Sequence, residues 1–493
     1  MTTDSRAPLP ALRTRAFIGG AFVDAVTGDE MTSLNPATGE PLADVASCDG
    51  HDVDRAVATA RQAFEDGRWS GRTPEERKHA LLAFADVIEQ HAEELAVLDA
   101  VDAGKPITDC RTIDVPETLR CLRWYAEAAD KVFGTVAPTG PSHLGLVVRE
   151  PVGVVGAVLP WNFPALMFAW KVAPALAAGN SVVVKPSELT PLSAIRMAEW
   201  AAEAGLPDGA LNVVPGLGET AGQAIGRHPD VDAVSFTGST EVGRLFLRYS
   251  SESNLKKVAL ELGGKNAQLV LSDPPDLDLV ASDVLLAGYW NMGENCSAGS
   301  RLLVHESVKD ALLERVLAHL PEWLVGDPLD PATRVGPMVE EEHLHRVLGY
   351  IQRGSQEGAR AIAGGARVLP DSGGYFVAPT VLDGVSPDMV VAREEIFGPV
   401  IAVMTFEDDE DALRLVNGTS YGLTASLWTR SLDRAVRLSR GIRAGTVSVN
   451  CFSEGDITTP FGGYKQSGFG GRDNGMEAFE QYTELKTTWV ALH

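Results

Sequence analysis

The sequence contains few cysteines and no long hydrophobic run. The five cysteines are odd in number and form no C-x-x-C pair, unlike a disulfide framework or a zinc site, so we expect no metal; they are Cys48, Cys110, Cys121, Cys296 and Cys451. No apolar stretch reaches the roughly 18 residues of a membrane-spanning helix, and the N-terminus lacks an apolar segment of signal-peptide length. We therefore expect a cytoplasmic protein with no membrane association.

A surplus of positive charge is also missing. Lys and Arg number 42 against 67 Asp and Glu, a formal net charge of −25, which argues against nucleic acid as a partner. Apolar residues make up 45% and charged residues 22%, as in ordinary globular proteins. A chain of 493 residues is long enough for about two to four domains.

Short β-branched runs alternate with helical patterns between residues 150 and 271. We predict strands at 152–159, 181–185, 211–214, 233–236, 258–262 and 267–271. Helices are predicted at 165–176 and 192–204. This alternation is typical of βαβ units that build a parallel sheet covered on both faces.

The flanking regions extend the α/β pattern. Residues 51–131 are predicted to be almost wholly helical, with helices at 54–64 and 74–100 and a break at Gly104-Lys105-Pro106. Strands are predicted at 300–304, 401–406, 425–428 and 446–450. The fold class is α/β, with a second sheet domain in the C-terminal half.

Two residues are candidates for covalent and acid–base chemistry. Cys296 stands among small residues in Gly-Glu-Asn-Cys-Ser-Ala-Gly-Ser-Arg (293–301), which suggests an attacking sulfur, although free cysteines usually pack as small hydrophobes. Glu261 stands beside paired glycines in Glu-Leu-Gly-Gly-Lys (261–265). It is either a mobile general base or a solvated acid beside a turn.

Two segments at predicted strand ends carry polar side chains, where ligands gather in parallel sheets. In Leu-Pro-Trp-Asn-Phe-Pro (159–164), Asn162 either donates its amide hydrogens to a developing oxyanion or caps the following helix. In Val-Val-Val-Lys-Pro-Ser-Glu (182–188), Lys185 and Glu188 either hold ribose hydroxyls or form a solvated surface pair.

Glycine turns and an acidic turn complete the candidates. Phe-Thr-Gly-Ser-Thr-Glu-Val-Gly (236–243) places its glycines at a strand-to-helix turn suited to phosphate, and a second turn, Pro-Gly-Leu-Gly-Glu-Thr-Ala-Gly (215–222), departs from the G-x-G-x-x-G spacing. Glycine also serves ordinary left-handed turns, so either role stays open. Glu-Glu-Ile-Phe-Gly-Pro-Val (394–400) supplies an acid and an aromatic, or simply a turn with a packed Phe.

These segments, with Pro-Phe-Gly-Gly-Tyr-Lys-Gln-Ser-Gly (460–468), occur in an order that resembles the NAD(P)-dependent aldehyde dehydrogenase superfamily over nearly the whole chain. The resemblance implies that Cys296 is the nucleophile, Glu261 the general base, Asn162 the oxyanion-hole side chain and Lys171 a proton-relay lysine. Trp161, Lys185, Glu188, Phe236, Gly238, Ser239, Glu395 and Phe397 match cofactor contacts, and Gly218 and Gly243 of the glycine turns are further candidates.

The resemblance also implies the domain plan. Residues 1–130 and 150–258 would form a cofactor-binding domain, 259–459 a catalytic domain, and 131–149 with 460–493 an oligomerisation extension and C-terminal segment. A homo-oligomer, a tetramer or a dimer, is expected. Two features depart from the family pattern: Glu294-Asn295 before the nucleophile and the run Gly288-Tyr289-Trp290-Asn291.

The implied reaction oxidises an aldehyde to a carboxylate through a hemithioacetal and a thioester on Cys296. NAD is the expected cofactor, with NADP possible, because Glu188 suits a ribose 2′-hydroxyl and repels a 2′-phosphate. The stretch 454–473 resembles dehydrogenases of amino-, guanidino- and γ-glutamylamino-butyraldehydes. Asp456, with Asp109 or Asp114, would attract a cationic tail, unless these are solvated loop acids.

Other functions stay open at this stage. A dehydrogenase for betaine aldehyde or broad aliphatic aldehydes would use the same residues. A non-redox binding protein on this fold would not require the thiol, acid and amide together, and an esterase would use the cysteine without nicotinamide.

Overall fold

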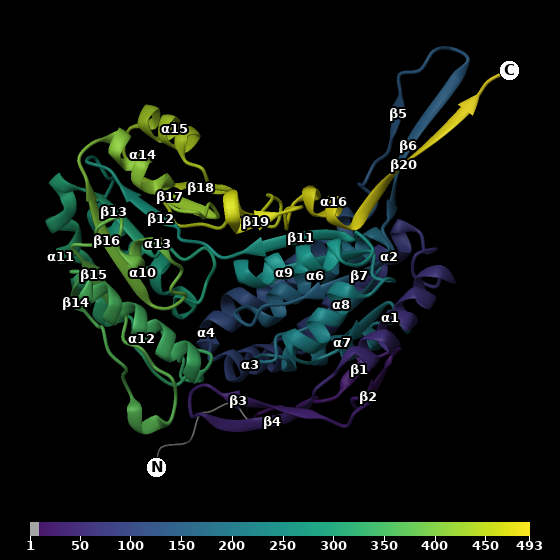
Figure 1. Cartoon of the computed structure of the whole chain (residues 1–493), viewed down its shortest axis with the longest axis horizontal. Coiled ribbons are helices and arrows are strands. Elements are labelled where there is room, and N and C mark those ends of the chain that lie inside the picture. Colours follow the sequence, from purple (N-terminus) through teal and green to yellow (C-terminus); the bar gives the residue numbers. More distant parts are fainter. Residues whose placement is uncertain (1–8) are drawn as a thin grey trace.

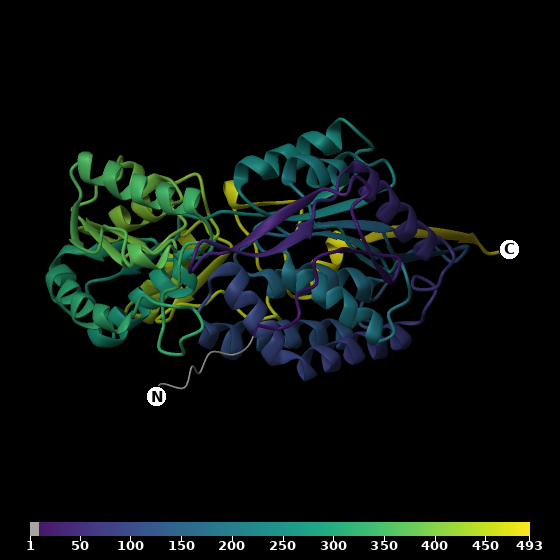
Figure 2. The same ribbon diagram turned by 90° about the horizontal axis from the view of Figure 1, so that it is seen from below.

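The computed structural model describes residues 9–493. Two sheet-centred regions lie side by side, and a narrow arm projects from one of them (Figures 1 and 2). Within the described residues no helix is long and apolar enough to cross a membrane.

The first region is built on an eight-stranded sheet. In spatial order its strands are β19 (Gly468–Phe469), β11 (Lys257–Leu262), β10 (Ala233–Gly238), β7 (Val154–Val158), β8 (Ser181–Lys185), β9 (Leu211–Val213), β1 (Ala16–Ile18) and β2 (Ala21–Val23). The strands from β11 to β9 are parallel, and β19, β1 and β2 pair antiparallel at the edges. All five parallel strands were predicted from the sequence and are confirmed.

Helices cover both faces of this sheet because its strands are apolar on both sides. Along β7, Val155 and Ala157 join one core cluster, whereas Val154 and Val158 join the other. One face carries α6 (Pro164–Ala178) and α7 (Leu192–Glu203), with α2 (Pro74–Gln90), α3 (Ala92–Ala103), the short α4 (Ile107–Asp109) and α5 (Val115–Ala128) beyond them. The other face carries α1 (Gly50–Glu65), α8 (Gln223–Arg227) and α9 (Thr240–Ser251).

The second region is built on a seven-stranded sheet, parallel except for β14. Its strands in spatial order are β14 (Arg360–Ala363), β15 (Thr380–Asp383), β16 (Val400–Phe406), β13 (Arg301–His305), β12 (Ala267–Val270), β17 (Thr424–Trp428) and β18 (Thr446–Val449). Its helices are α10 (Leu277–Tyr289), α11 (Lys309–His319), α12 (Glu341–Gln356), α13 (Val390–Arg393), α14 (Asp409–Asn417) and α15 (Leu432–Gly441). Two α/β sheets were predicted, and this is confirmed.

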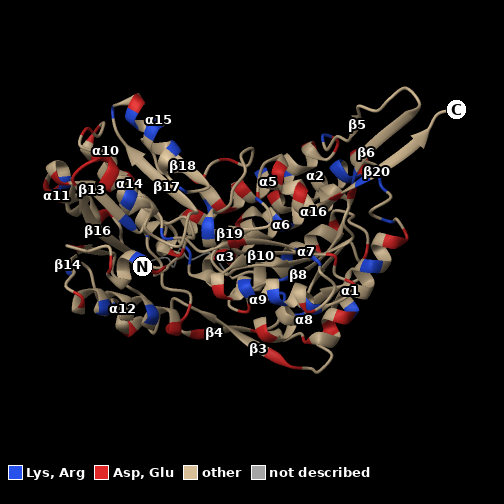
Figure 3. Cartoon of the chain, turned by 45° about the horizontal axis from the view of Figure 1, so that its top comes forward, with Lys and Arg blue, Asp and Glu red and all other residues tan. Residues whose placement is uncertain are grey.

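The arm is a three-stranded antiparallel sheet. Its central strand β6 (His143–Pro151) pairs with β5 (Thr135–Ala137) and with the C-terminal β20 (Thr483–Ala491), which follows α16 (Phe479–Tyr482). A separate hairpin joins β3 (Glu30–Asn35) to β4 (Glu40–Ala46). Acidic and basic side chains are interspersed over the helices, whereas the outer part of the arm carries almost none (Figure 3).

Three sequence predictions need correction. The helix predicted at 74–100 is two helices, because His91 leaves the helical conformation (φ −109°, ψ 20°) where its ring stacks on Trp200. The strand predicted at 267–271 belongs to the second sheet, where Ala267 pairs with Arg301 and Ala425. The predicted domain boundary at 258/259 falls inside β11, which belongs to the first sheet, so the change of sheet occurs at residues 263–266.

Candidate active site

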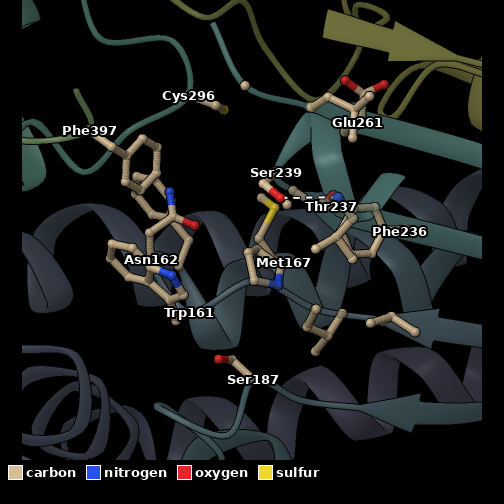
Figure 4. Close-up of a pocket in the computed structure, with 18 of the residues that line it drawn as sticks. Trp161, Asn162, Met167, Ser187, Phe236, Thr237, Ser239, Glu261, Cys296 and Phe397 are labelled. Atoms are coloured by element: carbon tan, nitrogen blue, oxygen red, sulfur yellow. Dashed lines mark hydrogen bonds between the residues drawn. The ribbon is translucent and has the colours of Figure 1, made fainter. Parts of the chain in front are cut away.

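A cavity of about 370 Å³ lies where the strands of the first sheet end, facing the second region. The segments that follow β7, β8, β9, β10 and β11 form one side of it, and the loop of Cys296, the segment of Glu395 and Phe397, and the C-terminal segment close it (Figure 4). Carboxyl ends of parallel strands meet at one edge, which is why residues far apart in sequence converge here. This volume is typical of a small-molecule site.

The Cys296 loop is fixed by its neighbours. The Asn266 side chain donates to the backbone oxygens of Cys296 (2.7 Å) and Ala298 (3.1 Å). A Cβ on Gly264 would lie 2.4 Å from the Cys296 carbonyl oxygen, so this close approach requires glycine. Cys296 lines the cavity and keeps partial solvent exposure. The thiol is therefore held in a defined place beside open space.

The Cys296 thiol is protonated in this arrangement. Burial raises its pKa well above the ordinary value, and the negative charges of Glu454, Glu395 and Glu261 raise it further. The thiolate is the nucleophilic form of cysteine. Attack by this sulfur thus requires removal of its proton and compensation of the resulting charge.

Glu261, the second-last residue of β11, also lines the cavity. Burial raises the pKa of this carboxyl well above its ordinary value; Asp473 raises it further, while Lys171 and Arg472 lower it. No described residue donates a hydrogen bond to its Oε2, which is buried. Figure 4 shows Glu261 and Cys296 at the edge of the pocket, on different segments. This acid therefore has one oxygen that makes no hydrogen bond within the described residues.

Lys171, on α6, lies behind the cavity rather than in its wall. Its Nζ is 2.5 Å from Asp473 Oδ2, and both side chains are buried. Gln481 donates to the other oxygen of Asp473 (3.1 Å). The charge of Lys171 therefore lowers the pKa of Glu261, and Lys171 also holds Asp473, which lines the cavity.

Asn162 does not cap α6, so that alternative is wrong. The N-cap is Phe163, and no side-chain cap bond is present. The Asn162 Nδ2 donates to the backbone oxygen of Glu294 (2.8 Å), two residues before Cys296. The Asn162 backbone oxygen accepts from Lys105 Nζ (3.2 Å) and Asn291 Nδ2 (3.1 Å). One amide hydrogen thus ties Asn162 to the cysteine loop, and the second is left for the cavity.

Trp161 and Phe397 form an aromatic wall. Their ring centroids are 5.2 Å apart in an edge-to-face arrangement. Phe397 adopts a left-handed backbone (φ 62°), and His343 Nε2 donates to its carbonyl oxygen at 2.6 Å. Burial lowers the pKa of His343 to about 4, so this imidazole is neutral. The Phe397 ring is therefore held by a hydrogen bond as well as by packing.

Lys185 and Glu188 pair across the loop after β8, with Nζ 2.6 Å from Oε2. Lys185 is only 3% exposed, so the alternative of a solvated surface pair is wrong for the lysine. Both residues line the cavity. A fixed cation and a half-exposed carboxylate at a strand end suit the hydroxyl groups of a ribose.

The glycine turns separate into two kinds. Gly218 and Gly238 line the cavity, and a Cβ on Gly218 would meet no atom within 4 Å, so it leaves room there. Ser239 caps α9 by accepting from the Val242 N–H (3.2 Å). Gly243 does not line the cavity: a Cβ there would lie 2.6 Å from Leu262 Cδ2. Gly243 is thus explained by close helix–sheet packing rather than by a ligand contact.

Glu395 is tied to the glycines that follow Glu261. Its Oε1 accepts from the Gly264 N–H (2.7 Å), and a Cβ on Gly263 would lie 2.0 Å from its Oε2. Burial raises the pKa of Glu395 to about 7, against the lowering effects of this N–H and of Lys265. Phe236, on β10, also lines the cavity.

The three acids predicted to attract a cationic substrate do not line the cavity. Asp114 is buried and lies 2.8 Å from Lys105. Asp456 is ion-paired with Arg120 on the surface. Burial raises the pKa of Asp109 to about 6, with Asp114 as a further cause. None of the three therefore contributes to the cavity wall, and Asp114 and Asp456 already have a basic partner, which sequence proximity does not show.

Sequence reasoning missed several cavity residues. Glu454 lines the cavity, and so do the apolar side chains Phe163, Leu166, Met167, Trp170 and Phe461. The aromatic residues lie within or beside the quoted motifs but read as ordinary core positions. Glu454 stands two residues before Asp456, in the same segment that was singled out for its acid.

A thiol, an acid and an amide that face one cavity at the carboxyl ends of parallel strands define an α/β enzyme with a cysteine-based site. The model of the Aldehyde dehydrogenase family matches residues 22–488. The chain therefore belongs to the aldehyde dehydrogenase family and is an oxidoreductase.

Similar proteins cover almost the whole chain. Aminoacetaldehyde dehydrogenase of Pseudomonas aeruginosa is 58% identical over 479 residues, 97% of this chain and 96% of the relative. The structure of gamma-glutamyl-gamma-aminobutyraldehyde dehydrogenase from Burkholderia cenocepacia has a TM-score of 0.96 at 52% identity, covering 98% of both chains. The indole-3-acetaldehyde dehydrogenase AldA of P. syringae, in complex with NAD⁺, has a TM-score of 0.97 at 50% identity, covering 98% and 97%.

Proposed function

We propose that this enzyme oxidises short aminoaldehydes to amino carboxylates with NAD⁺, and accepts NADP⁺ less well. The observation that carries the proposal is one cavity lined by Cys296, Glu261 and Asn162 together with all of the predicted cofactor contacts except Gly243. Two similar proteins bear names that specify aldehydes with nitrogen in the chain, which supports this substrate class.

In the first step the Cys296 sulfur attacks the aldehyde carbon. A C–S bond forms, the C=O π-bond pair moves to the carbonyl oxygen, which gains the negative charge, and the thiol proton passes to solvent. The free amide hydrogen of Asn162 and the Cys296 backbone N–H stabilise this oxyanion; one such donor is typically worth about 2.7–4 kcal/mol. The bond from Asn162 to Glu294 keeps the donor aligned with the cysteine loop.

The cavity walls fit a dinucleotide. Lys185 and Glu188 would hold a ribose, the start of α9 at Ser239 would face a phosphate, and the open space at Gly218 would admit the ligand backbone. Glu395 and Phe397 would hold the second ribose and the nicotinamide side. NAD⁺, when bound, supplies the acceptor for the hydride that leaves the substrate carbon.

Glu261 then acts on water. As a base it takes a proton from a water molecule that attacks the acyl carbon on Cys296, and the C–S bond breaks to release the carboxylate. Lys171 favours the ionised form of Glu261, which burial and Asp473 disfavour. The proton that Glu261 receives is returned to solvent before the next cycle.

The regions take separate roles in this proposal. The eight-stranded region binds the cofactor, the seven-stranded region supplies Cys296, and the arm pairs subunits into a dimer or tetramer. The arm exposes apolar side chains, among them Phe133 (77%), Val136 (66%), Leu485 (64%) and Trp489 (59%). Such a surface is typical of an interface. Sedimentation of the wild type and of Trp489→Asp tests the assembly, and cell fractionation tests the cytoplasmic location.

Activity of the purified protein tests the function. Formation of reduced nicotinamide is followed with NAD⁺ or NADP⁺ against aminoacetaldehyde, 3-aminopropanal, betaine aldehyde, propanal and benzaldehyde, with Cys296→Ala as the control. We expect the highest kcat/KM with the aminoaldehydes and no turnover by the variant. Equal rates with propanal would show a broad aliphatic dehydrogenase, and turnover by Cys296→Ala would contradict the mechanism.

A further inference from the structure

Glu454 is a cavity acid that the mechanism above does not use. It lies in the segment after β18 and reaches back to the cysteine loop. Asn295 Nδ2 donates to its Oε1 at 2.8 Å, and the Ser297 hydroxyl donates to the same oxygen. These two donors flank Cys296 in the sequence, so the Glu454 carboxylate is fixed beside the reacting sulfur.

The second oxygen of Glu454 is left unused. Among residues 9–493 no side chain or backbone group donates a hydrogen bond to Oε2, and no cation pairs with it. Lys105 and Asp114, whose charges act on Glu454 with opposite signs, are ion-paired with each other at 2.8 Å. The negative charge of Glu454 is therefore not neutralised by a neighbour.

The other acids that line the cavity already have a hydrogen-bond or ion-pair partner, or a role in the proposed reaction. Glu188 is paired with Lys185, Asp473 with Lys171, and Glu395 accepts the Gly264 N–H. Glu261 is the proposed base. Glu454 is thus the one acid in the described cavity wall with a fixed orientation, a free oxygen and neither a catalytic nor a cofactor-binding role in the proposed function.

Aromatic side chains lie in the same part of the chain. Phe461, seven residues after Glu454, lines the cavity with Trp170, and their ring centroids are 5.3 Å apart. Aromatic faces attract organic cations in addition to packing against methylene groups. Burial raises the pKa of Glu454 above its ordinary value despite the lowering effects of Ser297 and Asn295, and a bound cation would lower this pKa.

We propose that Glu454 Oε2 binds the ammonium group of the substrate and thereby selects short primary aminoaldehydes over neutral aldehydes. The inference rests on the proposed function and adds the residue that recognises the substrate. Because Asn295 and Ser297 hold Glu454 next to Cys296, the ammonium and the carbonyl carbon must be a few bonds apart. Aminoaldehydes with one or two carbons between these two groups, such as aminoacetaldehyde and 3-aminopropanal, satisfy this limit.

A purely structural role for Glu454 makes a different prediction. If Glu454 only held the cysteine loop, its loss would lower kcat/KM for all aldehydes by the same factor. Glu454→Gln keeps an oxygen that accepts from Ser297 and Asn295 but removes the charge, so it separates the two roles. Asp456→Asn is the matched control, because this neighbouring acid is ion-paired with Arg120 and lies outside the cavity wall.

The test compares substrates of equal size that differ in charge, 3-aminopropanal with butanal and aminoacetaldehyde with propanal, at saturating NAD⁺. In Glu454→Gln we expect the ratio of kcat/KM, aminoaldehyde over neutral aldehyde, to fall on the order of 10- to 100-fold, as for loss of a charged hydrogen bond. Asp456→Asn should keep the wild-type ratio. An unchanged ratio in Glu454→Gln would overturn the inference while leaving the proposed function intact.

A wild-type ratio near one would instead contradict the proposed substrate class. Inhibition by n-propylammonium against butanal provides a second measurement that needs no aminoaldehyde turnover. The inhibition constant should rise about 10-fold or more in Glu454→Gln. An inhibition constant equal to that of the wild type would exclude Glu454 as the ammonium site.

Discussion

The polar groups at one end of the cavity have partners within the protein, whereas reacting groups at the other end keep atoms without a partner in the described part of the chain. At the proposed cofactor end, Lys185 is paired with Glu188, and Glu395 accepts the Gly264 N–H. At the proposed reaction end, Glu261 Oε2 has no partner among the described residues, and the Cys296 thiol faces acids that disfavour its ionisation. Both ends are largely buried, so the contrast does not follow from solvent exposure.

This contrast indicates what each end must do. Groups that only bind can be satisfied and oriented before the ligand arrives, which lowers the cost of binding. Groups that react must keep a hydrogen bond or a charge interaction that is made only with the reacting molecule, since only interactions stronger in the transition state accelerate the reaction. Substitutions at the reaction end should therefore reduce kcat, and those at the cofactor end should raise KM.

The largest effect is expected for Cys296→Ala. Removal of the sulfur eliminates the covalent step, so kcat should fall by on the order of 10³-fold or more. NAD⁺ binding, followed by quenching of tryptophan fluorescence, should stay within about twofold of the wild type. A variant that turns over normally, or one that loses NAD⁺ binding as well, would erase the distinction between the two ends.

Glu261→Gln should separate the two halves of the reaction. Attack and hydride departure remain, so reduced nicotinamide should appear as a burst of about one equivalent per site. The steady-state rate should fall about 10²- to 10⁴-fold because water is no longer deprotonated. Rapid-mixing absorbance measures both phases. Loss of the burst together with the steady state would instead assign Glu261 to the first half.

Asn162→Ala removes one donor to the oxyanion. We expect kcat/KM to fall about 10²- to 10³-fold with little change in NAD⁺ affinity. Asn162→Asp is the size-matched second variant: it keeps the volume of the side chain but lacks the amide hydrogens, both the one that bonds the Glu294 carbonyl and the one that would meet the oxyanion. Activity in Asn162→Asp close to that of the wild type would argue against an oxyanion role.

The acidity of Cys296 predicts the pH dependence. Burial and the charges of Glu454, Glu395 and Glu261 raise the pKa of the thiol, so the thiolate fraction is small at neutral pH and grows as the pH rises. With butanal, which has no titrating group, kcat/KM should increase with pH by up to about tenfold per unit below that pKa. A profile that is flat or falls from neutral to alkaline pH would contradict this assignment.

The smallest effect is expected at the cofactor end. Glu188→Gln removes the carboxylate but keeps a hydrogen-bond acceptor, so KM for NAD⁺ should rise about tenfold and the preference over NADP⁺ should shrink. The value of kcat with saturating cofactor should change little. A fall in kcat at unchanged KM would show that this end also takes part in the chemistry.

The sequence predicted the sheets well because their strands are buried on both faces and bounded by clear helix and turn signals. Positions at strand ends followed from topology, which is why the segments of Asn162, Lys185 and Glu261 converge as expected. The side-chain contacts between residues far apart in the sequence could not be predicted. Gly243 is set by Leu262, and Asp114 is paired with Lys105, although neither relation has a sequence signal.

Long-range side-chain contacts also explain what was missed. Glu454 is oriented by Asn295 and Ser297, more than 150 residues earlier in the chain. The divided helix at His91 depends on stacking against Trp200. Local patterns specify elements and the edge at which a site forms, whereas pairing across the sheets decides which charged groups are free to act.

Trapping the covalent intermediate tests the role of Cys296 as the nucleophile most directly. Glu261→Gln is mixed with NAD⁺ and 3-aminopropanal, quenched in acid during the burst, and its intact mass is measured, followed by mapping of the modified peptide. The account predicts one 3-aminopropanoyl group per chain, carried as a thioester on Cys296 and absent from the double variant with Cys296→Ala. An unmodified protein at full burst, or an acyl group on any other residue, would contradict it.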